Sequence, residues 1–384
     1  MQKQTQKTDL ASILENPLIS FELQKAYDYI EGLHTKTPVA YFDTLNFENV
    51  EVELWAKLDS FNEGGSFKDR GSAYAVHKLI LDGKILKGDE IVTASAGNHA
   101  KGVARAAKLN GLTSVIFMAE HTPKTKIEGT LKLGAKIILV PGNYSDAARE
   151  AIRYSSENNK IYIPAYEDAN VIIGQSTVFN ETIMQLPSIP DFFVSPFGGG
   201  GLSNGGGLVA KHYLKMIGKK MYVFGVQSEN FNTMVQSYSN GAILPYLPSG
   251  DTIADGIKVP HASEQMLRLS LKYLDGMFDV TEEQIKDAIK QVYRNSPLHR
   301  LKEMPLDKLL SQHGKFGFTR HNALNGKRKR MNIVEGASAA AFAAVFNSKL
   351  PYARMSADLE KTKLVGVVIA SGNNIDESRL KEII

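Results

Sequence analysis

The lysine in the stretch GGSFKDRGSA (64–73) is the residue of this sequence best suited to nucleophilic chemistry. Lys68 follows Phe67 and stands where a helix is expected to begin. Because a helix N-terminus disfavours an additional positive charge, this amine is a candidate for a lowered pKa. A neutral lysine amine can form a Schiff base with a carbonyl compound. On spacing alone, however, a solvated lysine in a first helical turn is the better interpretation.

Two other segments present backbone N–H groups and small residues that suit an anion. TASAGNHAKG (93–102) follows an expected strand and places the residues Ser95–His99 at a helix start, although an ordinary cap explains this segment better when it is taken alone. SPFGGGGLSNGGGLV (195–209) has seven glycines within ten positions, so backbone amides can close around an anion. It lacks the lysine of a GxxxxGK[ST] loop, and buried strands before it disfavour a flexible linker. We therefore expect a phosphate cradle.

A fourth segment, VVIASGNNID (367–376), ends a strand with Ser371, whose hydroxyl can donate a hydrogen bond. All four segments follow or border expected strands, and strands alternate with helices along much of the chain. This alternation predicts an α/β fold with a mostly parallel sheet covered on both faces, where ligands bind at the carboxyl ends of strands. The expected strands are 51–58, 90–95, 114–119, 136–140, 191–197 and 363–370, and the expected helices are 67–80, 99–110, one after Thr125, 145–158, 282–294 and 335–348.

Length and composition limit the class of protein. At 384 residues, with 43% hydrophobic and 22% charged residues, the chain predicts a globular protein of two domains or lobes. It contains no run of eighteen apolar residues, and its polar start lacks the apolar stretch of a secretory signal. The absence of cysteine excludes disulfides, thiolate catalysis and thiolate metal sites. We expect a cytoplasmic protein.

In residue types and order, the four segments resemble the fold type II pyridoxal-phosphate family, which includes threonine dehydratase, serine racemase, threonine synthase and cysteine synthase. The likeness is greatest to the short, catabolic type of threonine dehydratase and extends from about Ala26 to the C-terminus. Nine blocks carry it: TPVAYFDTLN (37–46), SFKDRG (66–71), TASAGNHAKGVA (93–104), PAYEDANVIIGQST (164–177), GGGGL (198–202), FGVQSEN (224–230), TIADGIKV (252–259), VEGASAAA (334–341) and SGNNID (371–376).

The resemblance implies two lobes with mostly parallel twisted sheets covered by helices. A large cofactor-binding domain would comprise residues 1–89 and 166–384, and a small domain residues 90–165. The cofactor would be pyridoxal 5'-phosphate, and the enzyme would be a homo-oligomer, a dimer or tetramer, that acts on an amino acid.

The resemblance also implies a role for each residue of the site. Lys68 would carry the cofactor as a Schiff base and move the Cα proton, with Phe67 against the ring and Asn98 on the phenolic oxygen. The phosphate would lie in the loop formed by Gly198, Gly199, Gly200, Gly201 and Leu202. Ser371 would face the pyridine nitrogen, and Gly256 and Glu335 would line the same cleft. The substrate carboxylate would be received by Ser95, Ala96, Gly97, Asn98 and His99.

The implied reaction is the dehydration and deamination of L-threonine or L-serine to a 2-oxo acid and ammonia. Unlike an aspartate, Ser371 cannot stabilise a protonated pyridine nitrogen. The ring is then a weaker electron sink, which favours prompt loss of a β-hydroxyl over transamination.

Four departures from the family pattern bear on the reaction. Ala96 stands where serine racemases place a serine that protonates the opposite face of Cα, so racemisation should be poor. Asp69 after the lysine is typical of threonine synthases and keeps β- or γ-replacement chemistry open. Gln227 and Thr233 occupy positions where metal-dependent relatives have carboxylates, so we expect no metal site. Because few residues follow Ile375 in this sequence, we expect no C-terminal regulatory domain.

A basic segment, 296–331, has nine Lys/Arg residues and two acidic ones, which gives it a net charge of +7. Since the whole chain has a net charge of +4, the remaining residues have a net charge of −3. About thirty-five of its residues are an insertion relative to the catabolic type, which we expect to be a surface element that folding and cofactor binding do not need. A non-catalytic relative that binds an anionic partner, such as nucleic acid, through this segment is the alternative. The intact set of Lys68, Asn98, Gly198–Gly201 and Ser371 favours an enzyme instead.

Overall fold

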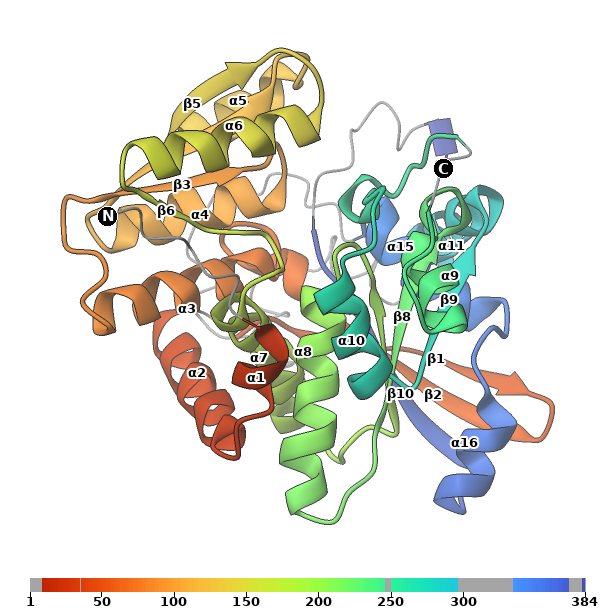
Figure 1. Cartoon of the computed structure of the whole chain (residues 1–384). Helices are drawn as coiled ribbons and strands as arrows, with labels where there is room; N and C mark the ends of the chain where they lie inside the picture. Colours follow the sequence, from red (N-terminus) through yellow and green to blue (C-terminus); the bar gives the residue numbers. More distant parts are fainter. Residues whose placement is uncertain (1–8, 35, 246–249, 296–333, 373–381, 384) are drawn as a thin grey trace, which may run out of the picture.

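The protein is described by a computed structural model that covers residues 9–34, 36–245, 250–295, 334–372 and 382–383 (Figure 1). Its larger sheet has six strands in the order β1-β2-β10-β7-β8-β9. The strands β1 (Val39–Phe47) and β2 (Val50–Leu58) pair antiparallel, and every other pairing in the sheet is parallel. The other four strands are β10 (Lys363–Ala370), β7 (Phe192–Pro196), β8 (Tyr222–Ser228) and β9 (Gly276–Val280).

Helices cover both faces of this sheet because its central strands are apolar on both sides. Along β7, Phe192 and Val194 pack into one core and Phe193 into the other, as the two-residue period of a strand requires. The first core includes α11 (Glu282–Asn295), α15 (Gly336–Phe346) and α16 (Tyr352–Leu359). The second includes α1 (Leu10–Leu14), α2 (Ile19–Leu33), α7 (Ala169–Gln185), α8 (Gly201–Leu208), α9 (Thr233–Asn240) and α10 (Glu264–Tyr273).

The smaller sheet has four parallel strands in the order β5-β4-β3-β6. They are β3 (Glu90–Ala94), β4 (Thr113–Ala119), β5 (Lys136–Val140) and β6 (Ile161–Tyr162). One face packs on α6 (Tyr144–Glu157), and the other packs on α3 (Lys68–Leu81) and α4 (Asn98–Leu109). A further helix, α5 (Lys124–Leu131), contacts α4 and β5. The α/β fold with mostly parallel sheets is therefore confirmed.

The sequence-based expectation lacked several elements, among them β1, β8, β9, α2 and α10, and two further differences bear on the site. Helix α7 was not predicted, because it is buried on nearly all sides and so lacks an amphipathic pattern. The glycine-rich stretch is a loop only at its start, since Gly201–Leu208 is helical and continues into a π-helix at Val209–Leu214. Side chains at Gly206 and Gly207 would clash with Phe179 and Tyr273, so these glycines allow close helix packing rather than anion binding.

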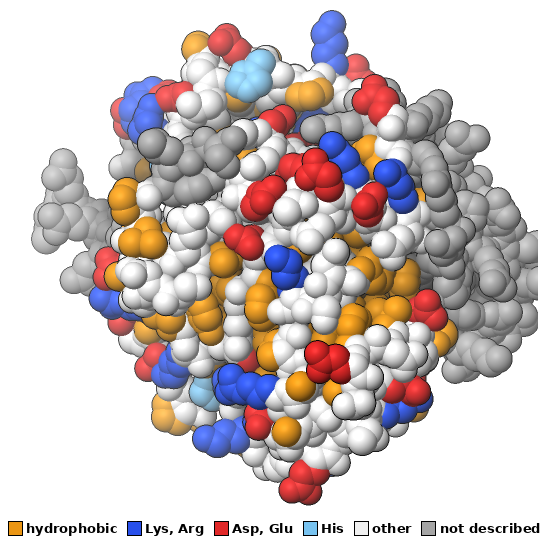
Figure 2. Space-filling model, turned by 90° about the vertical axis from the view of Figure 1, so that its right-hand side faces the viewer, with side chains coloured by type: hydrophobic (Ala, Val, Ile, Leu, Met, Phe, Trp, Pro, Cys, Tyr) orange, Lys and Arg blue, Asp and Glu red, His pale blue; other side chains and the backbone are white. Residues whose placement is uncertain are grey.

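The surface mixes apolar and charged groups. Seen from the right-hand side of Figure 1, hydrophobic side chains gather in a band across the middle, with acidic and basic side chains intermixed around it (Figure 2). In the part of the chain that the structure describes, no helix has the length and apolarity needed to cross a membrane. The basic segment 296–331 lies outside the described residues.

Candidate active site

Lys68 is the first residue of α3 and its amine is held inside the protein. Its Nζ donates a hydrogen bond to the carbonyl oxygen of Ala165 at 2.7 Å and lies 5.0 Å from the centre of the Phe67 ring. Burial lowers the pKa of Lys68 from its ordinary value to about 7. The expected lowering is thus confirmed, but its cause is removal from water rather than the helix terminus. A large fraction of this amine is neutral at neutral pH.

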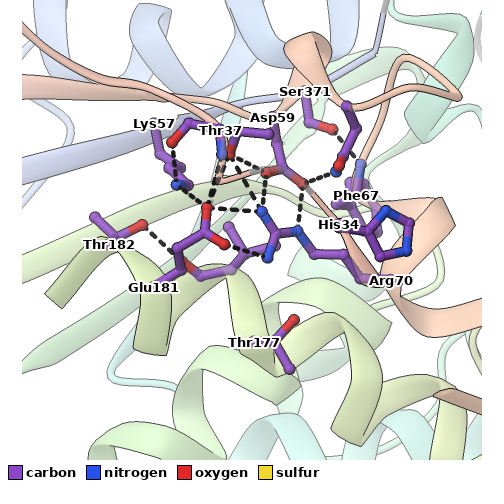
Figure 3. Close-up of polar contacts among 12 residues, drawn as sticks. His34, Thr37, Lys57, Asp59, Phe67, Arg70, Thr177, Glu181, Thr182 and Ser371 are labelled. Carbon is purple, nitrogen blue, oxygen red and sulfur yellow. Dashed lines mark hydrogen bonds and ion pairs between the residues drawn. The ribbon is translucent and has the colours of Figure 1, made fainter. Parts of the chain in front are cut away.

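Ser371 lies at the end of β10 beside the first turn of α3. Its Oγ accepts a hydrogen bond from the backbone N–H of Phe67 at 2.9 Å, and both residues are drawn in Figure 3. The Ser371 N–H donates to the Oγ of Ser338 at 2.8 Å, and that hydroxyl donates back to the Ser371 carbonyl oxygen at 2.7 Å. Because the Ser371 hydroxyl accepts from Phe67, its own proton is left to donate to a ligand.

The loop Gly198–Gly201 connects β7 to the start of α8. Gly200 has φ +93°, a conformation that favours glycine, and it forms the N-cap of α8. A side chain at Gly199 would clash with the Tyr166 ring, and one at Gly198 would lie 3.2 Å from the carbonyl oxygen of Gly256. The missing Cβ atoms therefore leave the backbone amides of this loop free to approach an anion.

Glu335 contacts two of the other expected site residues. Its buried carboxylate accepts a hydrogen bond from Nδ2 of Asn98 at 3.5 Å. Its Oε1 lies 2.9 Å from where a Cβ on Gly256 would stand, and a side chain at Gly372 would clash with the same carboxylate. Asn98, Gly256, Glu335 and the residue after Ser371 thus lie close together.

The segment 95–99 turns into the N-terminus of α4. Ser95 Oγ accepts from the backbone N–H of Gly97 at 3.1 Å, and Gly97 is the N-cap of α4. Nε2 of His99 lies 3.1 Å from the carbonyl oxygen of Ile163, and burial together with the charge of Lys68 lowers the His99 pKa to about 3. The imidazole is therefore neutral and directed at Ile163, so only the backbone amide of His99 is available to an anion at the helix start.

Gln175 is a site residue to which the sequence-based reading assigned no role. It is fully buried in α7, and its Nε2 donates to the Ala165 carbonyl oxygen at 3.4 Å, the same oxygen that Lys68 contacts. Its Oε1 has no hydrogen-bond partner and lies 2.5 Å from where a Cβ on Gly201 would stand. The side chain thus connects the lysine with the glycine loop. The one signal in the sequence was an amide within the apolar run ANVIIGQST.

Two of the departures noted in the sequence have structural roles of their own. The Oδ2 of Asp69 accepts from the backbone N–H of Gly64 at 2.6 Å, and burial raises the pKa of this carboxyl to about 6. The Oε1 of Gln227 accepts from the N–H groups of Met234 and Val235, both at 3.0 Å, and so caps α9. Among the described residues, no group of three His, Asp or Glu side chains is arranged to hold a metal ion.

The described residues fit pyridoxal phosphate. A phosphate requires donors around an open backbone, and the glycine loop offers amides at a helix N-terminus where added Cβ atoms would clash. An aldehyde requires a neutral amine, which Lys68 offers. Gln175 Oε1 and the Nδ2 of Asn204 are buried polar atoms without partners beside Gly201 and Gly200. Buried polar groups of this kind indicate a site that a ligand completes.

Comparisons with known proteins agree with this fit. Residues 30–298 match the family model described as pyridoxal-phosphate dependent enzyme. An L-threonine ammonia-lyase of Thermotoga maritima is 31% identical over 363 residues, which cover 94% of this chain and 77% of the relative. The catabolic L-threonine dehydratase TdcB of Escherichia coli is 30% identical over 338 residues, 88% of this chain and 87% of the relative.

Two solved structures have the same fold. The processed form of threonine deaminase isoform 2 from Solanum lycopersicum superposes with a TM-score of 0.72 at 27% identity, over 96% of this chain and 88% of that one. Maize serine racemase superposes with a TM-score of 0.72 at 26% identity, over 94% and 95%. From the match to the family model and from these relatives, the chain belongs to the family of pyridoxal-phosphate-dependent enzymes.

Proposed function

We propose that this protein is a pyridoxal-phosphate-dependent ammonia-lyase that converts L-threonine or L-serine to a 2-oxo acid and ammonia. The observation that carries the proposal is the buried amine of Lys68, with a pKa of about 7, next to the hydrogen-bonded Ser371–Phe67 pair. The two curated relatives described above are a threonine ammonia-lyase and a threonine dehydratase, which supports a hydroxy-amino acid as the substrate.

The residues that would hold the cofactor surround the first turn of α3. Lys68 would bind its aldehyde, with Phe67 against the ring and Ser371 on the ring nitrogen. The amides of Gly198–Gly201 and Leu202 would hold the phosphate. Asn98 would contact the phenolic oxygen, with Gly256 and Glu335 completing the cleft. Two sets of contacts support this arrangement. Glu335 lies next to both Asn98 and Gly256, and the Phe67 N–H donates a hydrogen bond to Ser371.

Bound pyridoxal phosphate supplies a ring that accepts the electrons left behind when the Cα proton is removed. The neutral amine of Lys68 is the base that takes this proton, and its pKa near 7 suits both accepting and returning a proton at neutral pH. Ser371 would offer the ring nitrogen a hydrogen bond without a formal charge, which would keep electron withdrawal moderate and favour early loss of the β-hydroxyl. The amides at the start of α4, with Ser95, Ala96, Gly97, Asn98 and the backbone of His99, would bind the substrate carboxylate.

Replacement chemistry of the threonine-synthase kind was kept open by Asp69. The Asp69 carboxylate is buried and bonded to the backbone of Gly64, so it serves the loop before Lys68. This contact removes the main reason to favour that alternative. A non-catalytic relative is disfavoured because Lys68, Ser371 and the glycine loop remain together.

The test uses the purified protein with L-threonine, L-serine, 3-hydroxyaspartate and O-phosphohomoserine. We expect 2-oxo acid and ammonia from a hydroxy-amino acid, and cofactor mass on the Lys68 peptide after borohydride reduction. If O-phosphohomoserine is the one compound that gives product, the lyase proposal is wrong and the protein catalyses replacement chemistry of the threonine-synthase kind. Label on another lysine, or no bound cofactor after reconstitution, would overturn the assignment of Lys68.

We further propose that residues 90–165 form the small domain, and that residues 1–89 and 166–384 form the large one. All four strands of the smaller sheet lie within 90–162, which supports these boundaries.

We also propose that the protein is a homo-oligomer and that it is located in the cytoplasm. Exposed apolar side chains at Leu18, Phe21 and Met216 would be covered by such contacts. Light scattering and cell fractionation test these two points.

A further inference from the structure

Arg70 lies two residues after Lys68, and the two side chains point to different sides of α3 because residues i and i+2 are about 200° apart on a helix. Lys68 contacts the carbonyl oxygen of Ala165 in the candidate site, whereas Arg70 is completely buried on the other side of the helix. Around Arg70 lie Thr37, Lys57, Asp59 and Glu181, and we call these five residues the Arg70 cluster. Figure 3 shows them converging from β2, α3, α7 and the segment before β1.

Two carboxylates hold the guanidinium of Arg70 from two sides. Its Nε and Nη2 donate to Oδ2 and Oδ1 of Asp59 at 3.1 and 2.8 Å. Its Nη1 and Nη2 donate to Oε2 and Oε1 of Glu181 at 2.9 Å each. Both contacts are two-pronged, an arrangement that only the planar fork of an arginine can make.

The cluster is balanced in charge. Lys57 is completely buried and donates to Glu181 at 2.5 Å, to Gln185 at 2.7 Å and to the Thr37 carbonyl oxygen at 2.8 Å. Two cations therefore face two carboxylates, and Thr37 Oγ1 donates to Asp59 at 2.6 Å. Such a fully paired set tolerates burial, whereas removal of one member leaves an uncompensated charge.

The cluster fixes both ends of the segment that carries Lys68. Asp59 follows β2 directly, and its Oδ2 also accepts from Asn62, whose Nδ2 contacts the carbonyl oxygen of Ser66 at 3.2 Å. The residues from 59 to 70 are thus connected at their start, their middle and their end. Glu181 ties the same point to α7, the helix that also supplies Gln175.

We propose that Arg70 is a positioning residue for Lys68: clamped by Asp59 and Glu181, it fixes the first turn of α3 so that the Lys68 amine stays buried in the cleft. This inference rests on the proposed function, in which Lys68 moves the Cα proton. It assigns to Arg70 no contact with substrate or cofactor.

The pKa of Lys68 reports on this position. Since burial is what lowers it, a first turn that lets water reach the amine raises that pKa toward the ordinary 10.5. A residue that merely stabilised the fold would leave this value unchanged in protein that remains folded.

The decisive variant is Arg70→Lys, which keeps the charge but cannot form both forks. The Lys68 pKa is measured on the full-length chain after any bound cofactor has been removed, by amine labelling at a series of pH values and mass spectrometry of the Lys68 peptide. We expect it to rise by about one unit or more, so that the neutral fraction of the amine at pH 7 falls about fivefold or more. In the holoenzyme, kcat should fall by about tenfold or more with little change in KM, as expected when a reacting group is misplaced.

Phe224→Leu, a buried change in the larger sheet away from the cluster, is the control. It should lower the melting temperature and leave the Lys68 pKa unchanged. If Arg70→Lys does not fold, the charge-balanced pair Lys57→Met with Glu181→Gln is measured in the same way, since it keeps the fork to Asp59 and releases α7.

A folded Arg70→Lys or double variant whose Lys68 titrates as in the unaltered protein, with unchanged kcat, would reduce Arg70 to a structural role. The failure of the proposed function is distinguishable. In that case the labelling shift is still seen, but no 2-oxo acid is released by either the unaltered protein or the variant.

Discussion

The two sides of the first turn of α3 handle buried positive charge in opposite ways. On the cleft side, Lys68 has a carbonyl oxygen as its partner, and burial lowers its pKa to about 7. On the other side, burial alone would lower the pKa of Arg70, but Asp59 and Glu181 hold it above its usual value. The reactive amine is left free to lose its charge, while the anchoring cation is fully compensated. This difference separates a group that must change protonation state from one that must not.

The largest effect on turnover is expected at the cleft side. Lys68→Ala should reduce 2-oxo acid release by about a thousandfold or more, because the base and the cofactor anchor are lost together. When both proteins are compared without cofactor, the melting temperature should not fall, since a buried amine with an incomplete set of partners is removed. Lys84→Ala, an exposed lysine, serves as the control. Substantial turnover by the Lys68 variant would show that Lys68 is not the catalytic base.

The largest effect on stability is expected at the other side. Glu181→Gln should lower the free energy of unfolding by about 3–5 kcal/mol, because it leaves a buried cation without its partner. Adding Lys57→Met should recover much of this loss by restoring charge balance. Glu150→Gln, in an exposed pair with Arg153, should leave the stability nearly unchanged, because solvent screens this pair. Urea unfolding of all three measures this, and equal losses at both glutamates would contradict it.

The pH dependence of turnover distinguishes the two cations. Lys68 works as a base only when neutral, so kcat should increase as pH rises through about 7 and then level off. Arg70 should add no limb to the profile, because its carboxylate partners keep it protonated. A limb near 10 instead would mean that Lys68 is solvated in the working enzyme. Initial rates at constant ionic strength over a series of pH values provide the measurement.

A smaller change should follow substitution of the hydrogen-bond donor on the cleft side. Ser371→Asp would protonate the ring nitrogen and strengthen electron withdrawal, which should raise the share of transamination and racemisation relative to 2-oxo acid formation. Ser371→Ala is the control for loss of the contact to the Phe67 N–H. An unchanged product distribution in the aspartate variant would contradict the proposal that Ser371 limits electron withdrawal by the ring.

The smallest change is expected at Ala96. With no acid/base side chain at this position, L-serine should give pyruvate with little D-serine, and Ala96→Ser should raise the D-serine fraction modestly. Ala96→Gly should not. Chiral chromatography of the reaction mixture provides the measurement. Comparable amounts of D-serine and pyruvate from the unaltered protein would show that Ala96 does not limit racemisation.

Local signals in the sequence were sufficient for several strands and for the helix start that carries Lys68. Strands at 136–140 and 363–370 were predicted with the bounds that the structure has, and the position of Lys68 at a helix start is confirmed. These predictions succeeded because strand alternation, helix starts and glycine-rich turns are encoded by residues close together in the chain. The resemblance to a known family then indicated which loops share one cleft.

What only the tertiary structure decided is how distant side chains compensate one another. The Arg70 cluster joins residues 37, 57, 59, 70 and 181, and no local pattern pairs Arg70 with Glu181, 111 positions away. Helix α7 and the role of Gln175 were hidden for the same reason, since burial on all sides removes the periodicity that marks a helix. By itself the sequence determined which residues could react. Packing determined the pKa of Lys68, because removal from water is a property of the assembled core.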